Sequence, residues 1–464
     1  MPSRALLESL YRAAVAAVDP ERLVAEAIGR RGRAFWVRSL SAARSREFVF
    51  LPGRLVVLAL GKSAVPMSRA AAQALSDRVD DALVVTPAGA PVDGLPPGWR
   101  VLEASHPEAD DRSLSAGEAA LALARSLEEE DLLLVLLSGG GSTLASAVPG
   151  DVPLRDKSRT VGLLLAAGAP TADVNVVRGA LSRIKSGRLA AAAGKATVVT
   201  LVVSDLGDGG WHLVASGPTL GIPPTPSEAL TVLDRYRLFP LVPPSVRTYL
   251  KFGNLPEITH PGANRWSVLL ADVRTAMEGA RRAAVAAGAE VRVIPELLVG
   301  EARAAARRLA VAGACAGNLV RRAGARHRRL VTVFGGETTV TVKGPGTGGR
   351  CRELALATAI RIAGVEGATA LVAGTDGVDH TSDAAGAFVD STTVERALAR
   401  GLDPYGALDA NDSGPFFSAL GDAFQPGPTG ASVGDLAFVL APEDGDAGWI
   451  PAGEEWEIPL PSVS

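Results

Sequence analysis

The sequence contains very few of the residues that form disulfides or soft metal sites. Only two cysteines, Cys315 and Cys351, and five histidines occur among 464 residues. This excludes a disulfide framework and argues against a zinc site held by cysteine and histidine. Metal chemistry in this chain would therefore use carboxylate oxygens, which suit hard cations such as Mg²⁺.

Long apolar runs and an excess of one charge are also missing. Runs such as 55–60 and 132–137 end after six residues, whereas a bilayer span needs about 20. The 47 basic and 50 acidic residues leave a net charge of −3, which is too weak to hold a nucleic-acid backbone. We therefore expect no membrane and no nucleic-acid partner, and a cytoplasmic protein.

The chain is rich in apolar residues, and their spacing indicates an α/β fold. Hydrophobic residues make up 47% of it and charged residues 21%, enough for real cores. An amphipathic helix over the first forty-odd residues is expected to cover the face of a sheet. Strands are expected at 55–60, 82–85, 100–102, 132–137 and 197–203. Because these runs are continuous and not alternating, they are typical of a parallel sheet buried on both faces.

A second, smaller α/β unit is expected after a proline-rich segment. Prolines within 223–226 and 240–244 predict a linker and hinge at 221–258, with domains at 1–250 and 251–464. The expected strands of the second unit are 267–270, 291–293, 330–334, 338–343, 369–373 and 436–440, and its helices are 276–287, 300–322 and 350–363.

The most informative loop follows the run 132–137. It consists of Ser138, Gly139, Gly140, Gly141 and Ser142. Three consecutive glycines allow backbone N–H groups to converge on an anion at a helix start, and at the end of a parallel strand this predicts a phosphate site. A flexible turn is the alternative, and the loop is not a Walker loop because no Gly-Lys-Ser/Thr follows.

Lys62 stands at the end of another buried run, 55–60, in a chain with only six lysines. An ammonium group is a compact charge suited to a phosphate or a carboxylate. A solvated position at the start of a helix explains the residue equally well.

Acidic residues gather after further expected strands. They are Asp205 with Asp208, Glu337, Asp376 with Asp379 and Asp383, and Asp412 after Asn411. Helix caps and turns explain each of them taken singly. Their shared position at strand ends predicts a site for Mg²⁺ together with substrate phosphates.

The segment 344–349 fits the pattern G-x-G-x-x-G, with Asp376 at the end of the next strand. This is the outline of a dinucleotide site. However, Thr339, Thr341 and Lys343 make one face of the preceding run polar, whereas the first strand of such a unit is buried on both sides. Pro345 also lacks an N–H donor. An NAD(P)-dependent hydroxypyruvate reductase stays open as an alternative.

Taken in order, the motifs resemble those of class II glycerate 2-kinases, whose carboxyl-terminal half is called the MOFRL domain. The matching segments of the first half are 61–64, 105–107, 137–142, 175–178, 181–182, 184–185, 204–205 and 215–219. Those of the second half are 335–340, 348–350 with Glu353, 373–379, 383–386, 411–413 with 416–417, and 427–430.

The resemblance implies a Rossmann-like first domain with a parallel sheet, a smaller α/β second domain and an active site in the cleft between them. It implies that phosphate passes from ATP, with Mg²⁺, to the 2-hydroxyl of D-glycerate. Lys62 and Arg350 match the family's catalytic basic residues, which suits a reaction governed by positioning and charge neutralisation. The oligomeric state stays open, a homodimer included.

The roles that follow from the resemblance are expectations. The ATP phosphates are expected at the loop 138–142 with Lys185, and Asp376 or Asp379 is expected to accept the substrate proton. Asp205 and Asp208 are the expected metal ligands. Substrate binding is expected at Arg178, Glu337, Thr338, Asn411 and Asp412.

The chain also departs from the family pattern. Asp208-Gly209-Gly210 stands where the family has Gly-Asp-Asp, and Cys351-Arg352 where it has Asn-Gln. With one carboxylate missing or shifted near residue 208, a non-catalytic homologue that binds a small molecule is a second alternative.

Overall fold

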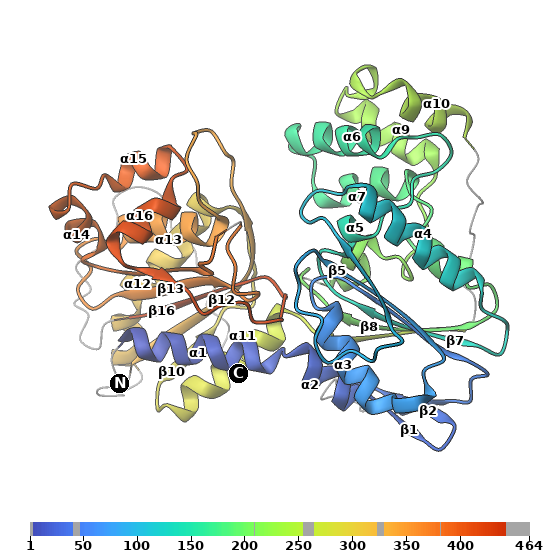
Figure 1. Cartoon of the computed structure of the whole chain (residues 1–464). Helices are drawn as coiled ribbons and strands as arrows, with labels where there is room; N and C mark the ends of the chain where they lie inside the picture. Colours follow the sequence, from blue (N-terminus) through green and yellow to red (C-terminus); the bar gives the residue numbers. More distant parts are fainter. Residues whose placement is uncertain are drawn as a thin grey trace.

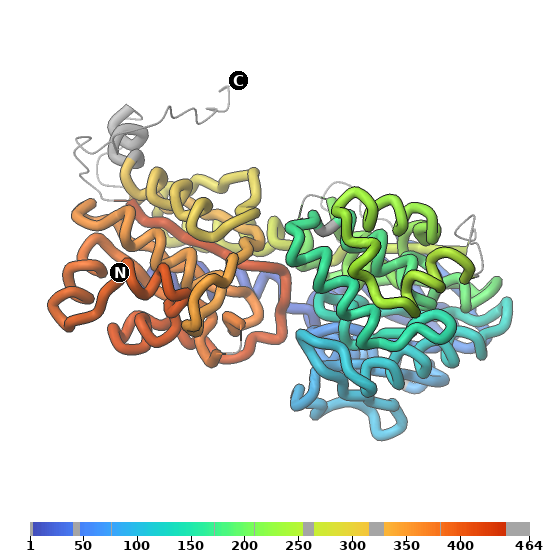
Figure 2. Tube along the Cα trace, turned by 90° about the horizontal axis from the view of Figure 1, so that it is seen from above, coloured from blue at the N-terminus to red at the C-terminus, as the bar shows by residue number. Residues whose placement is uncertain are grey.

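The computed structural model describes residues 3–39, 47–207, 209–253, 264–322, 329–380 and 382–441. These residues form two lobes that lie side by side, each built around a β-sheet (Figure 1). The view from above shows the blue and green first lobe beside the yellow and red second lobe (Figure 2). No helix among the described residues combines the length and the apolar character of a membrane span.

The first lobe contains a six-stranded parallel sheet with the order β6-β5-β4-β7-β8-β9. Its strands are β4 (Leu55–Leu60), β5 (Asp81–Pro87), β6 (Arg100–Ala104), β7 (Leu132–Leu137), β8 (Thr197–Val203) and β9 (Arg265–Ala271). Every residue of β4 and β7 is buried, as expected for strands covered on both faces. The parallel sheet and its five expected strands are confirmed.

The strand order of this sheet reverses between β4 and β7. The chain first builds outward from β4 to β6 and then returns to place β7 on the other side of β4. This is the order of doubly wound α/β sheets, which bind ligands at the carboxyl ends of the strands where the order reverses. The segments that begin at Gly61 and Ser138 leave the sheet at this point.

Helices and a small second sheet complete the body of the first lobe. The helices are α2 (Pro20–Ala27), α3 (Ala64–Leu75), α4 (Asp111–Arg125), α5 (Gly141–Leu144) and α8 (Arg188–Ala192), and the antiparallel strands are β1 (Ile28–Arg31), β2 (Ala34–Arg38) and β3 (Glu47–Phe50). The expected helix over the first forty-odd residues is therefore wrong beyond Ala27. In β2 the buried side chains of Phe35 and Val37 alternate with more exposed ones, which is the period of a strand.

Four helices form a cap on the first lobe, at the top of Figure 1. They are α6 (Leu154–Ala166), α7 (Thr171–Ala180), α9 (Pro226–Arg235) and α10 (Pro244–Phe252), and they share an apolar core. The expected linker and hinge at 221–258 is therefore wrong for its described part. Pro226 and Pro244 each occupy the first position of a helix, where the missing N–H costs nothing.

The second lobe contains a seven-stranded mixed sheet with the order β10-β12-β16-β13-β14-β15, in which β11 also pairs with β12. The strands are β10 (Glu290–Val293), β11 (Leu298–Glu301), β12 (Leu330–Thr339), β13 (Thr369–Gly374), β14 (Gly386–Asp390), β15 (Ala423–Phe424) and β16 (Asp435–Leu440). Strand β16 runs antiparallel to both β12 and β13. The two strands expected at 330–334 and 338–343 are one strand that ends at Thr339.

The helices of the second lobe are α1 (Ser3–Ala17), α11 (Val273–Ala286), α12 (Ala302–Arg322), α13 (Arg350–Arg361), α14 (Thr393–Ala399), α15 (Pro404–Asp409) and α16 (Ser413–Leu420). The first helix covers a sheet face as expected, because α1 packs against α11 and the strands β13 and β16. The hydroxyl of Tyr11 donates to Gly374 O at 2.8 Å, and its ring meets Phe424 edge to face.

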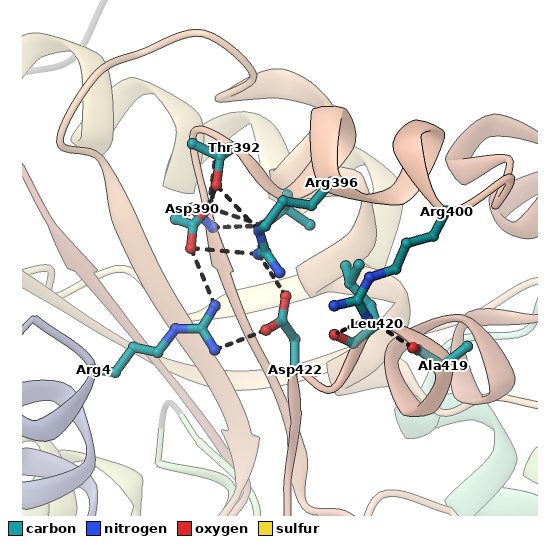
Figure 3. A network of polar contacts seen from close by, with 9 residues as sticks. Arg4, Asp390, Thr392, Arg396, Arg400, Ala419, Leu420 and Asp422 are labelled. Atoms are coloured by element: carbon teal, nitrogen blue, oxygen red, sulfur yellow. Dashed lines mark hydrogen bonds and ion pairs between the residues drawn. The ribbon is translucent and has the colours of Figure 1, made fainter.

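Charged residues fix the start of α1 to the second sheet (Figure 3). Arg4 donates to Asp422 Oδ1 at 2.7 Å and to Asp390 Oδ2 at 3.1 Å, and Arg396 reaches Asp422 Oδ2 from α14 at 2.7 Å. The shared carboxylates bind the first helix of the chain to strand β14 and to the segment before β15.

Among the described residues, the chain crosses between the lobes after α1 and again after β9. The strand expected at 267–270 exists, but as β9 it pairs with β8 in the first sheet. A strand that lies beyond residue 250 therefore belongs to the first sheet, so the two sheets are not divided at that residue. Whether 1–250 and 251–464 fold as independent units stays a prediction.

Candidate active site

The two strand tips at the reversal point of the first sheet are locked together. The Lys62 N–H donates to Gly139 O at 2.8 Å, and the Ser63 N–H donates to Ser138 Oγ at 3.0 Å. Gly61 has a φ of +132°, and a Cβ atom there would overlap Ser138. Only glycine fits this position. The Ser138 hydroxyl oxygen is engaged within the protein, because it accepts the hydrogen bond from Ser63 N.

The glycines that follow make room for charged side chains. A Cβ atom at Gly139 would overlap the carboxylate of Asp205. A Cβ atom at Gly140 would lie 3.1 Å from Lys62 Cγ and 3.2 Å from His106 Cδ2. The glycine-rich loop therefore allows Lys62, His106 and Asp205 to approach one another.

In the second lobe, Arg350 is held by two carboxylates at the start of α13. Its Nε and Nη2 donate to Asp435 at 2.6 and 3.0 Å, and its Nη1 lies 2.6 Å from Glu337 Oε1. Asp435 is buried, whereas the side chains of Arg350 and Glu337 are 37% and 41% exposed. The bidentate pair fixes the plane of the guanidinium group.

Asp435 is a residue that the sequence analysis missed. It opens β16 and pairs in register with Gly336 of β12 and Gly374 of β13. Because β16 is antiparallel to both neighbours, its first residue lies beside the last residues of theirs. Asp435 stands at the amino end of a strand and not at a carboxyl end, and its position directly before the apolar run 436–440 was a readable signal.

The two sets of charged residues meet in one cleft of 1550 Å³ between the lobes. Lys62 Nζ reaches across to Asp376 Oδ2 at 2.9 Å, and Ser63 Oγ donates to Gly430 O at 2.8 Å. Of the predicted site residues, those lining the cleft are Lys62, Asp205, Glu337, Thr338, Arg350, Asp376, Asp379 and Asn411.

Burial and neighbouring charges shift the protonation of three groups in the cleft. Burial raises the pKa of Asp205 although Lys62 and Arg350 oppose it. Burial also raises the pKa of Glu337 to about 7, again against the effect of Arg350. For His106, burial and then the charge of Lys62 lower the pKa to about 4.

His106 is a second residue that was left without a role. It follows β6, another strand of the parallel sheet, and it lines the cleft. With a pKa of about 4 its imidazole is uncharged at neutral pH. A histidine at the end of a parallel strand was the signal available in the sequence.

Thr338 has a buried hydroxyl on the wall of the cleft. Within the described part of the chain, its Oγ1 has no hydrogen-bond partner. Buried polar atoms are seldom left unpaired. This hydroxyl can therefore bind a polar group of a ligand.

Asp379 differs from Asp376 in its surroundings. Its carboxylate accepts hydrogen bonds from Cys351 N at 3.2 Å, Arg352 N at 3.0 Å and Arg352 Nε at 3.1 Å, at the beginning of α13. Gly349 is required beside it, because a Cβ atom there would overlap the carboxylate. Burial raises the pKa of Asp379. Its oxygens are engaged in holding the helix that carries Arg350.

Asn411 and Asp412 hold the loop 343–349. Asn411 Oδ1 accepts from Lys343 N at 2.8 Å and Gly344 N at 3.0 Å, and its Nδ2 donates to Glu353 Oε1 at 3.1 Å. Asp412 Oδ1 accepts from Thr347 N at 2.8 Å. Both residues were expected to bind substrate, and the structure engages their polar groups with the protein.

The other predicted site residues that the structure describes do not line this cleft; they are Ser138, Gly139, Gly140, Gly141, Ser142, Arg178, Lys185 and Asp412. Lys185 Nζ donates to Ser142 O at 2.7 Å under the glycine-rich loop, and Arg178 lies on α7 of the helical cap. Asp208 lies outside the described residues. Across the described ranges, no three His, Cys, Asp or Glu side chains gather as a metal site.

Comparison with known proteins gives two family matches. Residues 6–251 match a family described as a domain of unknown function, DUF4147, and residues 330–435 match the MOFRL family. A D-glycerate 2-kinase of Thermotoga maritima is 35% identical over 394 residues, which cover 83% of this chain and 90% of that protein.

Two further comparisons cover almost the whole chain. A protein of Agrobacterium vitis with the provisional name hydroxypyruvate reductase is 35% identical over 448 residues, 94% of each chain. The crystal structure of a glycerate kinase from Thermotoga maritima matches with a TM-score of 0.76 and 34% identity, covering 94% of this chain and 98% of that one. The chain thus belongs to the glycerate 2-kinase family that carries the MOFRL domain.

Proposed function

We propose that this protein is an ATP-dependent glycerate 2-kinase that phosphorylates the 2-hydroxyl of D-glycerate, giving 2-phosphoglycerate and ADP. The observation that carries the proposal is the cleft that Lys62 lines from one lobe and Arg350 from the other, with Lys62 paired to Asp376 and Arg350 to Glu337 and Asp435. Fixed cations on opposite walls suit a reaction in which charge moves between two oxygens. The family supports the same activity, since its members include a D-glycerate 2-kinase.

Arg350 and Lys62 neutralise the moving phosphoryl group and hold the substrate carboxylate in this proposal. Asp435 keeps two donors of Arg350 occupied, so the Nη1 edge is the part that a ligand reaches. Glu337 now occupies that edge at 2.6 Å. A substrate anion would replace Glu337, whose raised pKa of about 7 makes its protonation, and hence its release, easy at neutral pH.

Asp376 is the better candidate for the base. Its Oδ2 lies 2.9 Å from Lys62 Nζ in the cleft, whereas the carboxylate of Asp379 is occupied by backbone and side-chain donors of α13. A base must lie within hydrogen-bond reach of the hydroxyl whose proton it accepts. We assign proton acceptance to Asp376 and the positioning of α13 to Asp379.

The residues around the cleft fit a Mg²⁺ ion that is bound mainly through phosphates. Asp205 lines the cleft beside the glycine-rich loop, since a Cβ atom at Gly139 would overlap its carboxylate. Mg²⁺ in kinases uses one or two carboxylates, water and substrate phosphates. When bound, the ion supplies charge neutralisation at the transferred group. Asp205 is the residue that would hold it, and Asp208 stays a predicted ligand.

The reductase alternative depends on the loop 344–349, three of whose backbone donors are already occupied. Gly344 N and Thr347 N donate to Asn411 and Asp412, and Gly346 N donates to Ala410 O at 2.9 Å. A dinucleotide would need such N–H groups for its pyrophosphate. The glycines of this loop instead allow close packing, because a Cβ atom at Gly344 would overlap the backbone of Ala410.

A coupled assay of ADP formation across small hydroxy acids tests the proposal, with the product identified by NMR. Lys62→Ala and Arg350→Ala should each lower kcat/KM for D-glycerate by at least about 100-fold. The matched controls are Lys195→Ala and Arg281→Ala, which remove exposed cations that pair with Glu129 and Glu278 on the surface. Near-normal kcat/KM in both site variants would refute the assignment.

Two further measurements separate the alternatives. Oxidation of NAD(P)H with hydroxypyruvate would support the reductase, and binding of ATP without ADP formation would support a non-catalytic homologue. The homodimer and the cytoplasmic location also stay predictions, which light scattering and fractionation of cells can test.

A further inference from the structure

A second group of cations, two of them buried and one partly buried, lies under the glycine-rich loop, outside the lining of the cleft. It consists of Lys157 on α6, Arg178 on α7 and Lys185 before α8. Lys157 is 6% exposed and Lys185 is 2% exposed. We call these three residues the cation cluster.

The cation cluster makes hydrogen bonds to neutral oxygens only. Lys185 Nζ donates to the carbonyl and to the hydroxyl oxygen of Ser142, and Lys157 Nζ donates to Ser146 Oγ at 3.0 Å. The hydroxyl of Ser142 also lies 3.0 Å from that of Ser216. Within the described ranges, the Arg178 guanidinium has no hydrogen bond.

No carboxylate of the described residues forms an ion pair with any member of the cation cluster. The acids on the same two helices are engaged elsewhere: Asp173 binds Arg235 at 2.9 Å, and Asp156 accepts from Ser245. Burial and then the charge of Arg178 lower the pKa of Lys157 to about 7. Burial and both neighbouring cations lower the pKa of Lys185, and burial lowers that of Arg178.

Buried charges are normally paired, because removing an ion from water is costly and only an opposite charge compensates for it. Two buried lysines beside a partly buried arginine, without a carboxylate partner in the described residues, therefore indicate that the anion comes from a ligand. Two ammonium groups, a guanidinium group and several hydroxyls suit phosphate oxygens, which carry more charge than a single carboxylate.

The backbone beside the cation cluster is strained. Ala215 and Ser216 have φ values of +52° and +61°, and Ser186 has a φ of +54°. The two strained segments are joined, since the Ser186 N–H donates to Ser216 O at 2.9 Å. Such conformations persist where the surroundings impose them, often at ligand sites. Here they hold the Ser216 hydroxyl beside Ser142.

The glycine-rich loop contacts both the residues of the cleft and the cation cluster. Gly140 faces Lys62 and His106, and Ser142, two residues further on, binds Lys185. A polyphosphate that followed the loop would have Lys62 at one end and the cation cluster at the other.

We propose that Lys157, Arg178 and Lys185, with the hydroxyls of Ser142 and Ser216, bind the non-transferred phosphates of the nucleotide, while its terminal phosphate lies at Lys62 and Arg350. This inference rests on the proposed kinase function. It assigns Arg178 to the nucleotide, whereas the sequence predicted that Arg178 binds the substrate. It also places the phosphates beside the loop, at the side chain of Lys185.

The variants Lys157→Met and Arg178→Gln test the site on the full chain. Each should weaken the binding of ADP and of inorganic pyrophosphate, measured by calorimetry, by at least about tenfold, because each removes a hydrogen bond to a charged oxygen. KM for ATP should rise by a similar factor and KM for D-glycerate should stay within about twofold. The matched control is Lys195→Met, which removes an exposed lysine paired with Glu129.

Thermal unfolding separates binding from structure. A lysine that merely supports Ser146 would make the ligand-free Lys157→Met variant less stable. A buried cation without a carboxylate partner predicts an unchanged or higher melting temperature for the Lys157→Met variant, with the stabilisation by ADP lost.

The possible failures are distinguishable. Unchanged pyrophosphate and ADP binding in both variants, or a rise in KM for glycerate alone, would overturn the phosphate site and leave the kinase function standing. If the wild-type protein forms no ADP with any hydroxy acid, the proposed function fails. A loss of pyrophosphate binding in the variants would then still support an anion site.

Discussion

Asp435 provides the sharpest test of how the site is held in position. Its carboxylate binds Arg350 through two hydrogen bonds of 2.6 and 3.0 Å and is 4% exposed. Asp435→Asn keeps the shape and one acceptor but removes the charge and the second acceptor. Arg350 then keeps Glu337 as its only carboxylate partner among the contacts described. We expect the guanidinium group to turn toward Glu337 and away from its present plane.

The size of the effect follows from the hydrogen bond that is lost. A hydrogen bond to a charged group contributes about 1.5–3 kcal/mol. Because the Arg350 side chain is 37% exposed, solvent screening reduces the loss of stability to about 1–2 kcal/mol. For the reaction, misplacing one cation that stabilises the transferred group should lower kcat by about 10–100-fold, since each factor of ten corresponds to about 1.4 kcal/mol.

The matched control is Asp131→Asn. Asp131 is also a buried acid at the start of a strand and binds Arg54 Nε at 3.0 Å. However, it directly precedes β7, at the amino ends of the parallel strands, whereas the site lies at their carboxyl ends. Both variants should unfold at a lower urea concentration, whereas only Asp435→Asn should lose kcat in the coupled assay. Equal kcat values for the two variants would refute the positioning role of Asp435.

Three further predictions concern the loop, the cleft and the first helix. Gly140→Ala should lower kcat/KM and destabilise the fold by about 1–2 kcal/mol, because the residue has a φ of +82° and its Cβ would lie 3.1 Å from Lys62 Cγ; unchanged kinetics would contradict the close approach. The pKa of Glu337 rises from 4.5 to about 7 on folding, so the native state binds more protons and stability falls as pH rises through this window; Glu337→Gln should flatten that fall in urea titrations at several pH values. Arg4→Ala should cost only about 0.5–1 kcal/mol, because the Arg4 side chain is 40% exposed, and should leave kcat unchanged; a loss of activity would show that α1 influences the cleft.

The parallel sheet and the glycine-rich loop were predictable because their signals are local. Six consecutive apolar residues in β4 and β7 report burial on both faces, and the order of strands places their ends together. Lys62 could be selected for the same reason.

The antiparallel part of the site was not predictable in this way. Asp435 lies on the same side of the sheet edge as Glu337 and Asp376 because β16 is antiparallel to β12 and β13. The direction of a strand in a sheet depends on contacts between distant parts of the chain. The prolines of the helical cap indicate a linker in the sequence, whereas in the structure Pro226 and Pro244 begin helices. The cation cluster needed the contact between α6, α7 and the loop, since no spacing in the sequence joins residues 157, 178 and 185.

The ion pairs in the cleft explain why, in the proposed reaction, the charged groups become available only when the substrates bind. Lys62 pairs with Asp376 at 2.9 Å, and the Nη1 of Arg350 pairs with Glu337 at 2.6 Å. An anion that binds Lys62 weakens the first pair and leaves the Asp376 carboxylate available to accept the hydroxyl proton. An anion at Arg350 displaces Glu337, whose pKa of about 7 allows it to leave as a neutral acid. Binding of the two substrates would thus free both cations and the base, and before they bind each cation is neutralised by a carboxylate of the cleft.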